Sequence, residues 1–123
     1  MLLTSRETHR WVIPKGWPIR GLTPPEVAAR EAYEEGGLVG RIIGKRPVGA
    51  FHYLKQLPAS QVLCEVWVFV LWVDRQIGDW PEKGQRETRW VAPAEAAEMV
   101  NEEGLAAIMR GLSKAEIVLE NAT

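Results

Sequence analysis

The sequence predicts an α+β fold in which a mixed β-sheet lies between two helical layers. The segment Val62 to Val73 is apolar on both alternating faces apart from Glu65, which is typical of a strand covered on both sides. A capped segment at about 24–35 and an amphipathic segment after Asn101 would supply the covering helices. We expect Trp67 and Trp72, which lie on the apolar strand, to be core residues.

Length and composition narrow the classes of protein and partner. The 123 residues suffice for one domain with an ordinary core, and we expect a single domain over residues 1–123. The 15 Lys and Arg residues are balanced by 16 Asp and Glu, which argues against non-specific nucleic-acid binding. The longest apolar run, Val66 to Val73, is shorter than the roughly 20 residues of a membrane span. The single cysteine, Cys64, excludes an intramolecular disulfide and a cysteine-based zinc site. With no secretory signal, we expect a cytoplasmic protein without nucleic-acid or membrane partners.

The first elements follow from turn and capping signals. The apolar pieces Leu2–Thr4 and Arg10–Ile13 predict a hairpin, which Pro14 and Gly16 terminate. The sequence Thr23-Pro24-Pro25-Glu26 combines an N-cap, a proline at the first helical position and a capping box. Gly36-Gly37 then ends the helix as a glycine C-cap would.

Short strands and a second helix follow. Further strands are expected at Arg41–Lys45, Val48–Leu54 and Glu87–Val91, with loops at Gln56–Ser60 and Asp74–Gln85. Asn101 would cap a helix with apolar residues at i, i+3, i+4 and i+7, namely Leu105, Ile108, Met109 and Leu112. Lys114–Thr123 either extends this helix or forms a loose tail.

The first helix carries a stripe of carboxylates. At about 100° per residue, Glu31, Glu34 and Glu35 project from one face. Three crowded negative charges favour a cation between them, and Mg²⁺ prefers oxygen ligands. The alternative is a solvated face on which Arg30 pairs with Glu26 and Glu34 at i, i+4 spacing.

The order of residues around this stripe resembles a known family. Gly16, Arg30-Glu31-Ala32, Glu34-Glu35 and Gly37-Leu38 resemble the Nudix box, Gly-x5-Glu-x7-Arg-Glu-U-x-Glu-Glu-x-Gly-U, where U is apolar. The one departure is Leu22, which stands where the box has its first glutamate. The stretches from Trp11 to Gly16 and from Trp80 to Trp90 look like the bacterial branch near the diphosphoinositol-polyphosphate and diadenosine-polyphosphate hydrolases.

This resemblance implies a Nudix-like α/β/α sandwich that binds Mg²⁺ or Mn²⁺ and hydrolyses a diphosphate linkage in a small phosphorylated molecule, with a dinucleoside polyphosphate or a diphosphoinositol polyphosphate favoured. By resemblance the metal ligands are Glu31, Glu34, Glu35, the Gly16 carbonyl and Glu82. Arg30 would orient the glutamates, and because Leu22 replaces its usual partner, Glu26 or Glu34 would substitute. Glu31, Glu35, Glu82 and Glu87 are candidates for the general base.

Basic residues beside the box have two interpretations. They bind the outer phosphates of the substrate, or they are ordinary solvated charges. The candidates are Lys15, Arg20, Arg41, Lys45, Arg46, Arg86 and Arg89, with Lys15 favoured because it adjoins Gly16.

Two further alternatives concern the whole molecule. A non-catalytic Nudix-like sensor that binds a nucleotide is the second functional hypothesis, although a pure binder has no need of three crowded carboxylates. Members of the family usually carry another strand before Leu2–Thr4. Either this edge strand is missing or a neighbouring chain covers the edge, and we therefore expect a homodimer.

Overall fold

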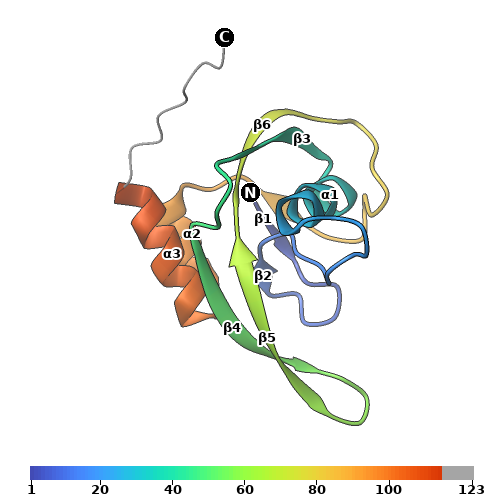
Figure 1. Ribbon diagram of the computed structural model, residues 1–123, viewed down its shortest axis with the longest axis vertical. Helices are drawn as coiled ribbons and strands as arrows, with labels where there is room; N and C mark the ends of the chain where they lie inside the picture. The colour runs from blue at the N-terminus through green and yellow to red at the C-terminus, as the bar shows by residue number, and fades with distance from the viewer. Residues whose placement is uncertain (115–123) are drawn as a thin grey trace.

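A long, bent antiparallel hairpin forms the centre of the fold. The computed structural model describes residues 1–114. Strands β3 (Leu38–Ile43) and β4 (Gly49–Gln56) run along one arm, and β5 (Gln61–Val68) and β6 (Val70–Gln76) return along the other. β3 pairs with β6 and β4 with β5, so the two pairs continue one another with an interruption at 44–48 opposite Phe69 (Figure 1).

A small second sheet lies beside this hairpin. Its central strand β1 (Leu2–Thr4) pairs antiparallel with β2 (Trp11–Val12) and with β7 (Thr88–Arg89). The predicted N-terminal hairpin is therefore confirmed, with a shorter second strand. In residues 1–114 the one parallel pairing is an isolated bridge from Trp11 to Val100.

Helix α1 (Pro24–Gly36) forms as the capping signals predict. The Thr23 side chain accepts a hydrogen bond from the Glu26 backbone, and the Glu26 carboxylate accepts one from the Thr23 backbone at 2.9 Å. At the other end Gly37 adopts the left-handed conformation with φ 69°. A Cβ at Gly37 would lie 2.4 Å from the Trp80 ring, so glycine is required there on two counts.

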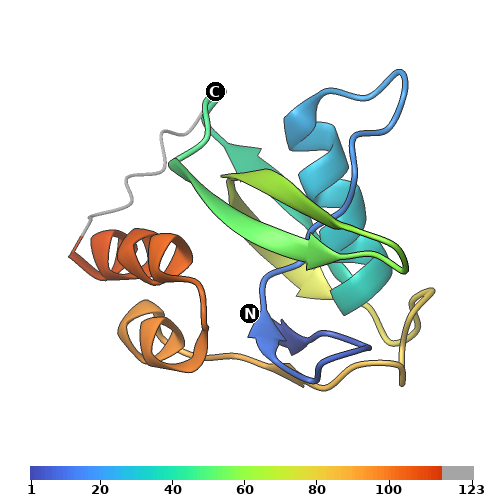
Figure 2. The same ribbon diagram turned by 90° about the horizontal axis from the view of Figure 1, so that it is seen from below.

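The elements form three layers. α1 packs against β3 on one side, whereas α2 (Pro93–Met99) and α3 (Glu103–Lys114) lie on the other side, where α3 packs on β4 (Figure 2). The predicted α/β/α layering is thus confirmed. α2 was not predicted, because its N-cap Ala92 has no side chain that could accept a capping hydrogen bond, and Pro93 and Glu95 were the helix-start signals present. None of the helices in the described residues is long and apolar enough to cross a membrane.

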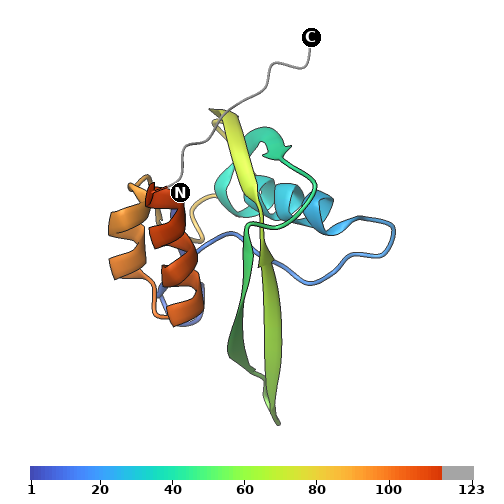
Figure 3. The same ribbon diagram turned by 60° about the vertical axis from the view of Figure 1, so that its left-hand side comes forward.

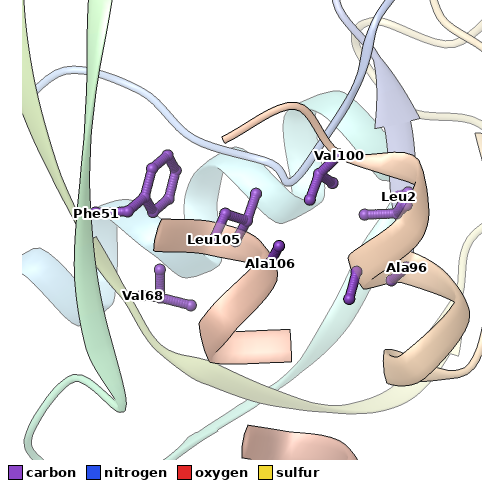
Figure 4. Close-up of a cluster of buried hydrophobic side chains, with 8 residues drawn as sticks. Leu2, Phe51, Val68, Ala96, Val100, Leu105 and Ala106 are labelled. Atoms are coloured by element: carbon purple, nitrogen blue, oxygen red, sulfur yellow. The ribbon is translucent and has the colours of Figure 1, made fainter. Parts of the chain in front are cut away.

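The hydrophobic core lies between the hairpin and the C-terminal helices. Leu2, Phe51 and Leu105 meet there, each at most 3% exposed, and Figure 4 shows side chains from β1, β4 and α3 gathered around the same space. The Cβ that an alanine would place at Gly104 lies 2.7 Å from the Phe51 Cβ, so α3 approaches the strand closely. This core fixes β1 and β4 relative to each other.

The expectation of one doubly buried strand over Val62–Val73 was wrong. The segment is two strands, and burial in β5 alternates, with Leu63 65% and Trp67 52% exposed. Trp72 is also 42% exposed, so neither tryptophan is a core residue. For β5 the reason is the placement of α1, which packs on β3 rather than on the projecting half of the hairpin formed by β4 and β5 (Figure 3).

Other boundaries moved by a few residues. The strand expected at Arg41–Lys45 is β3 at Leu38–Ile43, and β6 continues to Gln76, past the expected loop start at Asp74. α3 begins at Glu103 rather than directly after Asn101 and is described as far as Lys114. Whether the rest of Lys114–Thr123 extends this helix concerns residues outside the described part of the chain.

Candidate active site

The loop that follows β2 lies directly against the carboxylate face of α1. A Cβ at Gly16 would lie 2.5 Å from both Cδ and Oε1 of Glu31, so only a glycine lets the loop come this close. One residue earlier, the backbone N–H of Lys15 donates to Glu35 Oε2 at 3.1 Å. The predicted neighbourhood of Gly16, Glu31 and Glu35 therefore exists as a set of contacts.

Glu35 is the buried acid of this site. Its side chain is 6% exposed, and Oε1 lies 3.2 Å from Nη2 of Arg86. Burial raises the pKa of Glu35 to about 7, against the opposing effects of the Arg86 charge and the Lys15 N–H. The charges of Glu31 and Glu82 raise this pKa further.

Arg86 joins three segments of the chain. Besides Glu35 on α1, its Nη2 contacts Glu82 Oε1 at 3.1 Å, and its Nη1 donates to the Thr4 carbonyl on β1 at 3.1 Å. The guanidinium side chain is 10% exposed. The 77–87 loop is also tied to α1 by the backbone, since Glu82 N–H donates to the Glu34 carbonyl at 3.0 Å.

The remaining box residues separate into two groups. Glu31, Glu35, Glu82 and Arg86 line one large cavity of about 1250 Å³, and Leu22 lines it too. Glu34 and Arg30 line a smaller cavity of about 540 Å³ instead. Burial is the main cause that raises the pKa of Glu31, followed by repulsion from Glu34 and Glu82.

Arg30 does not occupy the position expected for an orienting residue. It is exposed, and no ion pair formed within residues 1–114 includes it. The expected substitute partners Glu26 and Glu34 therefore do not hold it. Glu26 is engaged instead in the capping box with Thr23.

The basic candidates are distributed unevenly. Lys15 lines the large cavity, and its Nζ donates to the Tyr53 hydroxyl at 3.2 Å and lies 4.6 Å from the centre of that ring. Arg20 and Arg41 are exposed and line neither cavity. Arg89 is exposed too, and its guanidinium stacks over Trp11 at 4.9 Å. Lys15 and Arg86 are thus the two predicted basic residues that the fold brings to the carboxylates.

Sequence reasoning did not assign Tyr53 or Lys55 to the site, and Tyr53 reads from the sequence as an ordinary strand residue. Both lie on the inward face of β4 and line the large cavity, and Lys55 Nζ lies 5.8 Å from the centre of the Trp17 ring. The signal available was their spacing of two and four residues from Phe51, which puts all three residues on one strand face. Thr4 was also missed, because a backbone carbonyl leaves no trace in a residue pattern.

The donor set suits a hard divalent cation. Glu31, Glu35 and Glu82 line one cavity, and carboxylate oxygens are the donors that Mg²⁺ and Mn²⁺ prefer. Within residues 1–114, no three acidic, histidine or cysteine side chains are close enough to form a ready-made metal cluster. Arg86, bound to both Glu35 and Glu82, occupies the space between those two carboxylates.

Comparisons with known proteins identify the family of the chain. A family model described as the NUDIX domain matches residues 1–112. Two proteins of Arabidopsis thaliana, "Nudix hydrolase 12, mitochondrial" and "Nudix hydrolase 13, mitochondrial", are 33% and 31% identical to the chain over 103 and 105 residues. Each alignment covers 80% of this chain but 50% and 52% of the relative, so the chain spans about half the length of these relatives. Because the family model matches nearly all described residues, the chain belongs to the Nudix domain family.

Proposed function

We propose that the chain hydrolyses a diphosphate linkage in a small phosphorylated molecule with the help of Mg²⁺ or Mn²⁺. The observation that carries this proposal is the contact of the Gly16 loop with Glu31 and Glu35 on α1. The relatives named as Nudix hydrolases support a hydrolytic function. The activity is a proposal here, because the chain spans about half the length of those relatives.

The carboxylates of Glu31, Glu35 and Glu82, with the Gly16 carbonyl, would hold the cation. When bound, it would neutralise the diphosphate and acidify an attacking water. The candidates for the general base remain Glu31, Glu35, Glu82 and Glu87, as the family resemblance implies. Lys15, whose Nζ donates to the Tyr53 hydroxyl, would bind a substrate phosphate.

The substrate class is proposed from the charged and aromatic side chains that line the large cavity. Lys15 and Lys55 place two cationic groups on the cavity wall, each beside an aromatic ring, which favours a substrate with several phosphates. A dinucleoside polyphosphate or a diphosphoinositol polyphosphate remains our prediction. The relatives named above are plant proteins, and the resemblance to a bacterial branch is likewise part of this proposal.

Chromatographic identification of the hydrolysis products from a substrate panel tests the function, because cleavage of a dinucleotide or of ADP-ribose gives two phosphorylated fragments rather than free phosphate. Dinucleoside polyphosphates, ADP-ribose, nucleoside triphosphates and diphosphoinositol polyphosphates are each incubated with and without Mg²⁺. We expect Mg²⁺-dependent turnover of at least one polyphosphate, and a loss of about 100-fold or more in Glu31→Gln and Glu35→Gln. Glu98→Gln, on the exposed side of α2, is the control that should keep its rate. Tight nucleotide binding without turnover would favour the sensor hypothesis instead.

We also propose that residues 1–123 form one domain and that the protein is a cytoplasmic homodimer. The edge beside Leu2–Thr4, on which the sequence expectation of a dimer rested, is not free, because β1 is a central strand that pairs with β2 and β7. We therefore place the proposed contact on another edge, that of β5 and β6. In residues 1–114, β5 and β6 each pair on one side only, which leaves a long row of backbone groups open to pairing. Light scattering should give the mass of two chains, and the mass of one chain would contradict the dimer.

A further inference from the structure

We infer that Arg86 is the positioning residue of the site: its guanidinium holds the carboxylates of Glu35 and Glu82 together when no divalent cation is bound. This inference rests on the proposed function, because it concerns residues that would hold the cation. Arg86, in the 77–87 loop, would thus orient the glutamates, a role that the family resemblance gives to Arg30.

The contacts of Arg86 carry the inference. One nitrogen, Nη2, lies 3.2 Å from an oxygen of Glu35 and 3.1 Å from an oxygen of Glu82. The opposite edge of the fork donates to the Thr4 carbonyl at 3.1 Å, so the guanidinium is fixed from a third side. A planar group with five donors can satisfy three partners at once, which a lysine ammonium on a flexible stem does less well.

Burial makes these contacts consequential. The side chains of Arg86 and Glu35 are 10% and 6% exposed, so water screens their charges poorly. Without the guanidinium, two carboxylates would remain close together with no cation between them. A divalent cation could then restore the balance, because it offers positive charge to the same oxygens.

Arg30 lacks these properties. It is exposed, forms no ion pair within residues 1–114 and lines the smaller cavity. Arg6 comes closer, at 3.7 Å from Glu82, but its side chain is 55% exposed. Of these basic residues, Arg86 alone has a side chain that is mostly shielded from water and contacts two carboxylates.

Thermal unfolding of the full chain, in EDTA and in saturating Mn²⁺, tests the inference. Arg86→Gln should lower Tm in EDTA by several degrees, and Mn²⁺ should recover most of that difference, so that Mn²⁺ raises Tm more in the variant than in the wild type. Arg86→Lys keeps the charge and should lie between the two in EDTA. Arg89→Gln, which removes an exposed arginine of the neighbouring strand, should give the same Mn²⁺ shift as the wild type.

Each other result has a defined meaning. An equal Mn²⁺ shift in the wild type and Arg86→Gln would overturn the inference alone, because Arg86 would then be a structural residue independent of the cation. No Mn²⁺ shift in either protein would contradict both the inference and the metal dependence of the proposed function. If Arg86→Gln does not fold in EDTA, the comparison is made with Arg86→Lys, and an Mn²⁺ shift no larger than that of the wild type overturns the inference.

Discussion

The Glu35 carboxylate shows which properties of a functional residue are visible in a sequence. The helical period places it on the same side of α1 as Glu31, and both line the large cavity. Its burial and its partner Arg86 depend on a loop far along the chain, and no local pattern encodes that contact. Glu34 shows the limit of arguing from the helical period. The spacing groups it with Glu31 and Glu35, but it lines the smaller cavity.

The raised pKa of Glu35 predicts how the stability of the metal-free protein changes with pH. The pKa is about 7 in the folded state against 4.5 for the free side chain, so the folded protein binds more protons between these values than the unfolded chain does. Its free energy of unfolding should therefore fall as pH rises from about 4.5 to 7. Glu31 contributes with the same sign.

Denaturant unfolding in EDTA at several pH values checks this prediction. Glu35→Gln has no carboxyl to titrate, and its stability should change less over the same window. A wild-type protein that becomes steadily more stable from pH 4.5 to 7, with no difference from Glu35→Gln, would show that burial does not perturb this carboxylate.

The contact at Gly16 predicts a loss of activity from a single methyl group. In Gly16→Ala the new Cβ would lie 2.5 Å from the Glu31 carboxylate, so that side chain must move away from its place. Because the displaced atoms are the end of a flexible side chain, the cost in stability should be about 1–3 kcal/mol, while turnover falls by about 10-fold or more.

Gly78→Ala is the matched control for Gly16→Ala. Its Cβ would have nothing within 4 Å and Gly78 has no positive φ, so activity should stay close to that of the wild type. Steady-state rates of both variants measure the effect on turnover, and urea unfolding measures the effect on stability. A Gly16→Ala protein with full activity would mean that the Glu31 carboxylate has no fixed place in the reaction.

At the level of elements, sequence signals that act within one helix or strand predicted structure better than signals whose effect depends on the elements packed against it. α1 was predictable because Thr23, Glu26 and Gly37 act within a few residues of one another. β5 was not, because apolar residues on both faces do not reveal whether a helix covers each face. The outward side of β5 carries large apolar residues that stay exposed.

The two faces of the β4–β5 hairpin should therefore respond differently to truncation. Phe51 is 3% exposed in the core, and Phe51→Ala should cost about 3–5 kcal/mol of stability. Trp67 is 52% exposed on the other face, and Trp67→Ser should cost about 1 kcal/mol or less. Urea unfolding measures both, and similar large losses would indicate that the outer face is covered in solution.

At the level of the whole molecule, the site is assembled from segments far apart in the sequence. The Gly16 loop, helix α1, the 77–87 loop and the end of β1 meet through Lys15, Glu35, Arg86 and Thr4. The family pattern covered the first two segments and so predicted the Gly16–Glu31 neighbourhood. The roles of Arg86 and Tyr53 needed the fold, since their positions follow from how the sheets and loops pack.

The most direct measurement is the anomalous scattering of manganese in crystals grown or soaked with Mn²⁺ and a non-hydrolysable dinucleotide. The account predicts a manganese peak beside the carboxylates of Glu31 and Glu35, next to Gly16, with the phosphates of the dinucleotide in contact with it. Ordered phosphates in the large cavity, with no manganese near these carboxylates at saturating concentration, would contradict metal-dependent hydrolysis at this site.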